Sequence, residues 1–386
     1  RCDVSSICRW KDPRAPEFNF VRETDYCSGA AFAVPAAVWR QLGGFDARYA
    51  PAYCEDSDFA FRARAAGFRV VYQPFSEVIH HEGLSHGRDP RGGIKASQVR
   101  NRDVLVARWR SVLAAGHFAN GENLFVARDR SRDRPHVLFI DHYVPQPDRD
   151  AGSRSIFDFL RTFLERGFRV TLWPENQHYD RVYVERLQRM GGEVVYALAH
   201  GRDLGAWLDD AGGALGYVFL SRPQVARHVM ATVRRHTTAK VLFYGHDLHW
   251  QRLELEYQAT GNPALPAHIR DLRELEIAMC AAADAVFYPS EAECAVVRRE
   301  VATPVFMLPM GAFDTPGGER EDGAGDARQL LFVGGFAHAP NVDGVEWFIA
   351  EIWPQLLRRD PALRLTVAGS NPPERIMNLA SAEVSV

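Results

Sequence analysis

The chain has 386 residues, and a prior of about 150 residues per domain predicts two or three domains. Hydrophobic residues make up 46% and charged residues 25% of the sequence, which excludes a disordered or fibrous protein. The 46 basic and 49 acidic residues leave a net charge of −3, which argues against a general binder of polyanions such as nucleic acids.

The first block, residues 1–128, mixes short apolar runs with aromatic and charged clusters. Ser28-Gly29-Ala30 is a run of small residues where a backbone can approach a ligand closely. Gly43-Gly44-Phe45-Asp46 predicts a turn. Glu55-Asp56-Ser57-Asp58 places three carboxylates just before a helical run over residues 59–66. These carboxylates either cap that helix or, because crowding raises the pKa of a carboxyl group, supply a general base.

Residues 129–135 are charged, lack large apolar side chains and end in proline, which predicts a linker. Residues 137–140 then form an apolar run typical of a strand buried on both faces of a parallel sheet. Apolar residues recur at helical spacing between 156 and 164, and strand-like runs follow at 170–173, 217–220, 241–244 and 285–288. This alternation predicts an α/β, Rossmann-like doubly wound domain over residues 136–314.

A second turn-rich stretch precedes residues 328–386, which begin a new strand–glycine–helix unit. Residues 330–335 and 363–367 are its strand signals. A parallel sheet needs more strands than these, and the chain starts at Arg1 rather than methionine. We therefore expect a last domain that is cut short and a chain that is an internal piece of a longer protein.

Two polar stretches of the Rossmann-like domain are candidate binding sites. Asp150, Gly152 and Ser153 lie before the first helix, where they either bind an anion or hydroxyl or simply cap the helix. His246 and Asp247 follow a strand, at the carboxyl edge where doubly wound sheets bind ligands. Their spacing is weak evidence for a metal and favours polar contacts to a sugar or contacts between domains. The region lacks G-x-G-x-x-G, which argues against a nicotinamide dehydrogenase.

None of the six cysteines has zinc-finger or C-x-x-C spacing. We expect reduced, mostly buried thiols of a cytosolic protein, with a bridge between the first two cysteines as the alternative. The cysteines are Cys2, Cys8, Cys27, Cys54, Cys280 and Cys294.

The order of motifs in the first block resembles the C-terminal half of family-2 glycosyltransferases of GT-A fold. The resemblance rests on Ser28-Gly29-Ala30, Gly43-Gly44-Phe45-Asp46, Glu55-Asp56-Ser57-Asp58, Arg62 to Gly67 and His80-His81. The downstream run from His81 to Gly87, with Lys95, Gln98, Asn101 and Trp109, is similar to members that build bacterial surface polysaccharides.

The resemblance implies that Asp56 is a catalytic base, which takes the proton of an acceptor hydroxyl as its oxygen attacks the anomeric carbon of a nucleotide sugar. Glu55 and Asp58 would position the acceptor or hold the local structure. Arg62, Lys95 and His81 would neutralise the leaving diphosphate, and His81 is also a candidate metal ligand; a strand-end histidine pair is the alternative.

The family also uses a divalent metal, Mg²⁺ or Mn²⁺, held by an upstream D-x-D on the nucleotide-binding half. That half is absent from this sequence, and Asp56-Ser57-Asp58 belongs to the acceptor-side motif instead. We therefore expect this block alone to be inactive.

Residues 136–314 resemble the N-terminal, acceptor-binding domain of family-4 glycosyltransferases of GT-B fold, and residues 328–386 resemble the opening of its C-terminal, donor-binding domain. Gly334 and Gly335 would let the backbone approach a donor diphosphate, or they make a tight turn. The family's E-x7-E motif would lie beyond Val386, and no cofactor is expected for this module. The matching residues are 137–141, 150–153, 245–249, 283–284, Ser290, Glu293, 309–311, 331–335, 341–343 and 347–348.

Together these resemblances predict part of a tandem glycosyltransferase that takes sugars from nucleotide-sugar donors to a glycan or lipid-linked glycan acceptor during assembly of O-antigen, capsule or exopolysaccharide. No apolar run approaches the roughly 18 residues of a membrane helix, so we expect a cytoplasmic protein, with peripheral association at the inner face of the membrane. The alternative is a non-catalytic sugar-binding or scaffold module of a polysaccharide assembly complex.

Overall fold

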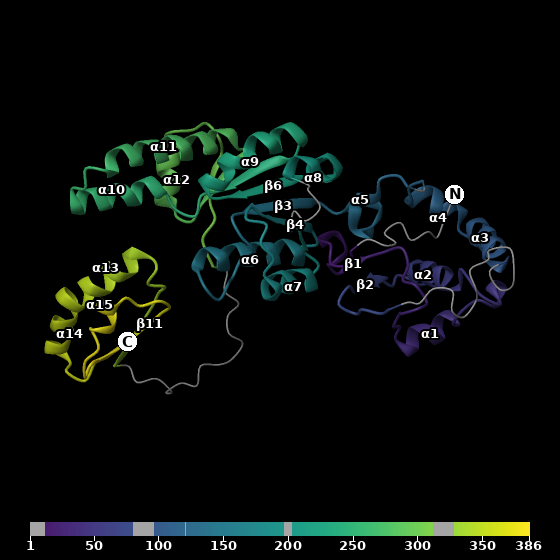
Figure 1. Ribbon diagram of the computed structural model, residues 1–386, viewed down its shortest axis with the longest axis horizontal. Coiled ribbons are helices and arrows are strands. Elements are labelled where there is room, and N and C mark those ends of the chain that lie inside the picture. Colours follow the sequence, from purple (N-terminus) through teal and green to yellow (C-terminus); the bar gives the residue numbers. More distant parts are fainter. Residues whose placement is uncertain (1–11, 80–95, 120, 197–202, 312–327) are drawn as a thin grey trace. The chain divides into compact units, whose positions relative to one another are not determined.

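The computed structural model describes residues 12–79, 96–119, 121–196, 203–311 and 328–386. The chain divides into two compact units (Figure 1). The first unit comprises Arg1–Pro145 and Ser155–Met310, and the second comprises Gln146–Arg154 and Gly311–Val386. Within the described residues, no helix combines the length and the apolar character that crossing a membrane requires.

The first block is built from short helices beside a two-stranded antiparallel sheet, in which β1 (Arg22–Glu23) pairs with β2 (Val71–Tyr72). Its helices are η1 (Pro16–Phe18), α1 (Ala36–Leu42), η2 (Ala47–Tyr49), α2 (Glu55–Ala65), α3 (Ala96–Arg108), α4 (Arg110–Gly116) and α5 (Leu124–Ala127). The predicted turn after α1 is confirmed, because Gly43 adopts a left-handed φ of 74° and ends the helix. The helix predicted over 59–66 begins earlier, so the carboxylates of the acidic motif form its first turn.

The rest of the first unit is a doubly wound α/β domain with a seven-stranded sheet in the order β5-β4-β3-β6-β7-β8-β9, and every neighbouring pair is parallel. If these strands are renumbered in chain order, the arrangement is the Rossmann order extended by one strand. The predicted α/β class is therefore confirmed. The strands are β3 (His136–Asp141), β4 (Arg169–Pro174), β5 (Glu193–Val194), β6 (Tyr217–Ser221), β7 (Lys240–Tyr244), β8 (Ala285–Tyr288) and β9 (Val305–Met307).

Both faces of this sheet are covered by helices, which explains why β3 and β4 are buried along their whole length and why residues 137–140 of β3 are all apolar (Figure 1). One core packs α6 and α7 on the sheet, and the other packs α8, α9, α11 and α12 on the opposite face. A capping box formed by Ser290 and Glu293 opens α12. The helices are α6 (Ala151–Glu165), α7 (Arg181–Arg189), α8 (Leu204–Ala211), α9 (Pro223–His236), α10 (His249–Thr260), α11 (Leu265–Ala282) and α12 (Glu291–Val297).

The predicted linker is a structured connection between the first block and the Rossmann-like domain. Residues Arg130–Asp133 form the 3-10 helix η4, whose preceding residue, Asp129, is 4% exposed. Asp129 lies 3.3 Å from Arg169 Nε, at the start of β4. Charged side chains of this segment therefore form contacts that join the first block to the Rossmann-like domain.

In the second unit, β10 (Gln329–Val333), β11 (Arg364–Ala368) and β12 (Val384–Ser385) form a parallel sheet in that order. Its helices are α13 (Ala339–Trp347), the π-helical turn η7 (Phe348–Ile352), α14 (Trp353–Arg359) and α15 (Glu374–Met377). Their apolar side chains pack on one another in a core of their own around Trp353 and Ile376. The predicted strand–glycine–helix unit is confirmed by β10, Gly334-Gly335 and α13.

No disulfide joins the four described cysteines, in agreement with the predicted reduced thiols. Cys54, Cys280 and Cys294 are buried, and Cys27 is half-buried. Cys2 and Cys8 lie outside the described residues.

Candidate functional site

The small-residue loop and the acidic motif of the first block lie together. The Gly29 N–H donates a 2.8 Å hydrogen bond to Asp56 Oδ2, and the Ser57 N–H donates to Asp56 Oδ1 at 2.6 Å. A Cβ at Gly29 would approach the Asp56 Cβ to 3.3 Å, so the close packing of the loop favours glycine. The loop is exposed while Asp56 is half-buried, which leaves the carboxylate near the surface in a fixed orientation.

Unusual backbone conformations precede this carboxylate. Tyr53 and Cys54 have left-handed φ values of 75° and 71°, which non-glycine residues rarely adopt. Asn101, which is fully buried, donates to the carbonyls of Tyr49 at 2.7 Å, Ala52 at 2.7 Å and Tyr53 at 3.1 Å. The asparagine side chain thus holds the turn that aims α2, and such strained turns are concentrated at functional sites.

Glu55 differs from its neighbour Asp56. Its Oε2 atom is buried and has no hydrogen-bond partner in the described part of the chain. Burial raises the pKa of Glu55, and the negative charge of Asp56 acts in the same direction. A carboxyl group with a raised pKa is suited to proton transfer.

Asp58 and Arg62 are engaged in structural contacts. Asp58 is fully buried and accepts hydrogen bonds from the Tyr49 hydroxyl at 3.1 Å, Trp109 Nε1 at 2.9 Å and Arg62 Nε at 2.8 Å. Arg62 also donates to the carbonyl of Gly44 at 2.6 Å. Of the two roles open to Asp58, these contacts favour holding the local structure. His81 and Lys95 lie outside the described residues, so their roles stay predictions.

A second constellation occupies the Rossmann-like domain where the strand order reverses, between β3 and β6. Asp141 ends β3 and Ser221 ends β6, so both lie at the carboxyl edge where such folds bind ligands. Arg222 donates from Nε to Asp141 Oδ1 at 3.0 Å, and His142 Nδ1 lies 3.0 Å from the same oxygen. Burial would raise the pKa of Asp141, but His142 and Arg222 outweigh it and lower that pKa to about 2.

His246, predicted as a site residue, belongs to this constellation. Its Nε2 lies 2.6 Å from the Ser221 hydroxyl, and both residues are buried. Burial, reinforced by the charge of Arg222, lowers the pKa of His246 to about 3, so the imidazole is neutral at pH 7. His246 and Arg222 both have left-handed φ values, 67° and 69°. We name Asp141, Ser221, Arg222 and His246 the switch-point cluster.

The neighbouring residues hold the start of α10. Asp247 accepts from Arg252 Nη1 at 3.0 Å. His249 Nδ1 lies 2.9 Å from Oε1 of the fully buried Glu276, which also accepts from the His249 N–H. Within the described ranges, no group of three or more His, Cys, Asp or Glu side chains is arranged to hold a metal ion.

The remaining predicted site residues make local contacts. The Ser153 N–H and hydroxyl both donate to the Asp150 carboxylate at 2.7 Å, beside Gly152 in the first turn of α6. A Cβ at Gly334 would lie 2.9 Å from Asn341 Nδ2, which donates to the Gly335 carbonyl at 2.8 Å. Helix capping accounts for the first pair and a tight turn for the glycines, while ligand binding by either stays a prediction.

Sequence reasoning missed Ser221 and Arg222. The signal available was that an apolar strand run ends at Leu220, just before a serine and an arginine. That signal becomes informative only when the strand order places the end of β6 beside the end of β3.

The chain is 35% identical over 124 residues to an N-acetylglucosaminyl-diphospho-decaprenol L-rhamnosyltransferase of Mycobacterium tuberculosis, a match that covers 30% of this chain and 40% of the relative. The chain thus spans less than half of that relative's length. No family model matches the chain.

Among solved structures, a protein described as a UDP-N-acetylglucosamine 2-epimerase of Listeria monocytogenes is 14% identical, with a TM-score of 0.40 and coverage of 66% of this chain and 68% of that one. The glycotransferase of kitacinnamycin is also 14% identical, with a TM-score of 0.34 and coverage of 65% and 70%.

Proposed function

We propose that this chain carries parts of two glycosyltransferase modules, a family-2-like first block of GT-A type and a family-4-like module of GT-B type. The similarity to a rhamnosyltransferase supports transferase chemistry. The main structural support for the first module is the hydrogen bond that the Gly29 N–H donates to the Asp56 carboxylate. The switch-point cluster supports a separate ligand site in the second module.

In the first module, Asp56 acts as the base. Its carboxylate accepts the proton of an acceptor hydroxyl, the hydroxyl oxygen forms a bond to the anomeric carbon, and the bond to the nucleoside diphosphate breaks with inversion. Hydrogen bonds from Gly29 and Ser57 orient the carboxylate before the acceptor arrives. The D-x-D ligands of the divalent metal that the resemblance implies are not in this sequence, which offers only His81 as a candidate ligand, so no step of this proposal passes through the metal.

Glu55 is the alternative base, because its pKa is raised and one of its oxygens is unpartnered. Replacing the true base removes a contribution of about 10²–10⁴ in rate. We therefore expect Asp56→Asn to lower transfer by that factor and Glu55→Gln to lower it far less. The opposite ranking would assign the base to Glu55, and unchanged transfer by both variants would refute the carboxylate mechanism.

In the second module, the switch-point cluster binds the acceptor. The Arg222 side chain is 23% exposed, so its guanidinium can contact an anionic group of the acceptor while Asp141 holds it in place. The neutral His246 exchanges hydrogen bonds without adding charge. A lipid-linked glycan carries both a diphosphate and sugar hydroxyls, and it matches these groups. Both modules would act in the assembly of a bacterial surface polysaccharide, at the inner face of the cytoplasmic membrane.

A non-catalytic sugar-binding module is the second candidate. The observation that favours it is that both Asp56 oxygens already accept hydrogen bonds within the protein. The two candidates differ in turnover: release of nucleoside diphosphate from a nucleotide sugar in the presence of acceptor supports the enzyme, whereas saturable acceptor binding without release supports the binding module.

The surrounding reading frame offers an independent test of the tandem proposal. We expect a D-x-D motif upstream of residue 1 and an E-x7-E motif downstream of residue 386. Finding neither motif would refute the tandem assignment.

A further inference from the structure

A cavity of about 200 Å³ lies where the first block meets the Rossmann-like domain. Arg22, Glu23 and Arg69 line it from the first block, and Arg169 and Glu193 line it from the start of β4 and β5. It lies at the amino edge of the parallel sheet, opposite the edge that carries the switch-point cluster, and neither Gly29 nor Asp56 is among its lining residues, so it is separate from both proposed transfer sites. We name it the junction cavity.

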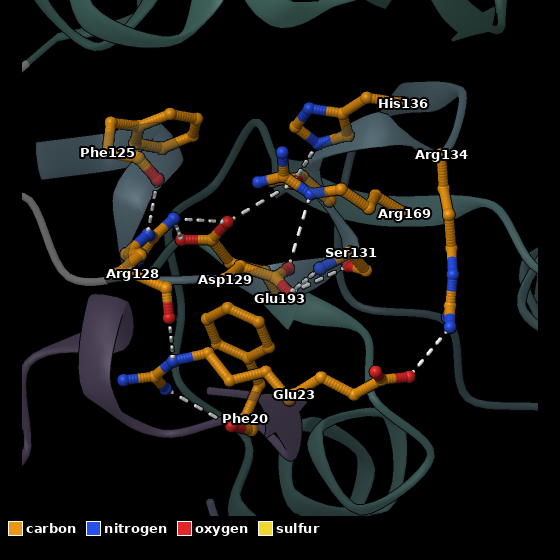
Figure 2. A network of polar contacts seen from close by, with 12 residues as sticks. Phe20, Glu23, Phe125, Arg128, Asp129, Ser131, Arg134, His136, Arg169 and Glu193 are labelled. Carbon is orange, nitrogen blue, oxygen red and sulfur yellow. Dashed lines mark hydrogen bonds and ion pairs between the residues drawn. The ribbon is translucent and has the colours of Figure 1, made fainter. Parts of the chain in front are cut away.

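A buried, incompletely paired cation forms part of its wall. Arg169 is 6% exposed, and its Nη1 atom has no hydrogen-bond partner among the residues that the structure describes. Its Nε lies 3.3 Å from Asp129 Oδ2, but without the alignment of a hydrogen bond. Figure 2 shows this guanidinium between the carboxylate of Asp129 and the ring of His136. A buried donor left without a partner is destabilising, so a ligand that accepts from Nη1 would offset that cost.

The carboxylates around the cavity are already paired. Arg128 Nη2 donates to both oxygens of Glu193, at 2.6 and 2.8 Å, and Arg134 Nη2 donates to Glu23 at 2.6 Å (Figure 2). Asp129 accepts from the Ser131 N–H at 2.9 Å through Oδ1, and its Oδ2 forms the ion pair with Arg169 at 3.3 Å. These three acids are therefore not free to neutralise further cations.

Two arginines of the first block remain in excess. Among the residues that the structure describes, Arg22 donates only to backbone carbonyls, including those of Arg128 at 3.2 Å and Phe20 at 3.3 Å, and no carboxylate lies within ion-pair distance of it. Burial and the nearby charge of Arg128 both lower the pKa of Arg22. Arg69 approaches Glu23 only to 3.9 Å. The cavity and its immediate neighbours thus contain five arginine side chains and three carboxylates, which leaves two positive charges in excess.

We propose that the junction cavity binds a small oxyanion of the phosphate class, held between Arg22 of the first block and Arg169 of the Rossmann-like domain. Guanidinium groups match the oxygens of phosphate in both geometry and charge. A dianion would balance the two excess cations. The junction cavity is too small for a whole nucleotide sugar, because pockets for small-molecule ligands have volumes of about 300–1,000 Å³. The bound anion would fasten the first block to the Rossmann-like domain.

Binding can be measured on this chain without any assay of transfer. Isothermal titration with inorganic phosphate, at constant ionic strength set by chloride, should show saturable binding and a matching rise in the melting temperature. One charge-assisted hydrogen bond contributes about 1.5–3 kcal/mol, so Arg22→Gln and Arg169→Met should each weaken the affinity by about 10-fold or more. The exposed Arg181→Gln, whose ion pair lies within α7, is the matched control and should bind like the unchanged chain.

Arg169→Met is a substitution in the protein interior, and this variant can fail to fold. In that case Arg22→Gln and Arg69→Gln still test the proposal. A parallel titration with a nucleoside diphosphate distinguishes a free ion from the phosphate end of a larger molecule. Equal affinity for both supports the cavity as a general phosphate site. Three results would each overturn the proposal. The first is a lack of saturable phosphate binding, and the second is binding of the nucleotide alone. The third is an affinity for phosphate that is unchanged in Arg22→Gln and Arg69→Gln, which would indicate an adventitious ion only.

Discussion

Removing the Glu193 carboxylate tests how the first block is fastened to the Rossmann-like domain. Glu193 is 4% exposed and accepts from Arg128 Nη2 at 2.6 and 2.8 Å and from Thr171 Oγ1 at 3.3 Å. Breaking a buried pair by removing one partner costs about 3–5 kcal/mol. Arg128 keeps hydrogen bonds to the carbonyls of Glu17 at 2.9 Å and Phe125 at 3.2 Å. We therefore expect Glu193→Gln to lower the free energy of unfolding by about 3 kcal/mol, the lower end of that range.

Urea unfolding followed by tryptophan fluorescence measures this change, and a double mutant separates its causes. Arg128→Met with Glu193→Met removes both charges, so it should recover most of the stability that Glu193→Gln loses. Glu185→Gln is the control, because its partner Arg181 has a side chain that is 80% exposed, and a cost within about 0.5 kcal/mol is expected. A cost for Glu193→Gln no larger than that of Glu185→Gln would refute the buried-pair reasoning.

Three further perturbations follow from the structure, each read out by thermal or chemical unfolding. The pKa of His246 is about 3 in the folded chain and about 6.5 in the unfolded chain, so the stability that its neutral form contributes is fully present above pH 6.5 and is lost as the pH falls toward 3. His246→Gln should therefore reduce the dependence of stability on pH, and an unchanged pH profile in this variant would contradict the assignment. Gly245→Ala would place a Cβ 2.2 Å from Tyr288, so it should cost about 2 kcal/mol or more, whereas Gly213→Ala meets nothing within 4 Å and serves as its control. Asp58→Asn should cost about 3 kcal/mol because it leaves Arg62 without a buried partner charge; a cost like that of the exposed Asp103→Asn would contradict this.

The Rossmann-like domain was predictable because its central strands are buried on both faces and therefore contain apolar runs without alternation, as at residues 137–140. The short strands β5 and β9 were missed, since Glu193–Val194 is too brief for periodicity to show. Strand order also decides which side chains meet. The approach of Arg222 to Asp141, across 81 residues of sequence, could not be read from local pattern.

The first block shows the same limit at its junction. Its motif order correctly brought Ser28-Gly29-Ala30 and Asp56 into one hypothesis, and the loop and carboxylate are in contact. The charged run after Arg128 indicated a linker, and the pairing of Asp129 and Arg128 with Arg169 and Glu193, far along the chain, could not be predicted from it. Composition identifies such charges, while their burial depends on partners that only the tertiary fold supplies.

The most direct test of the tandem proposal is a transfer assay on the protein with its adjoining reading frame, in which the sugars added to a lipid-linked acceptor are identified by mass spectrometry. Asp56→Asn and Arg222→Met should abolish the addition of different sugars, because each variant disables one module. Asp103→Asn, an exposed change in the first block, should leave the products unaltered. If Asp56→Asn and Arg222→Met both gave the product pattern of the unchanged protein, or both lost the same single sugar, the assignment of two transfer modules would be wrong.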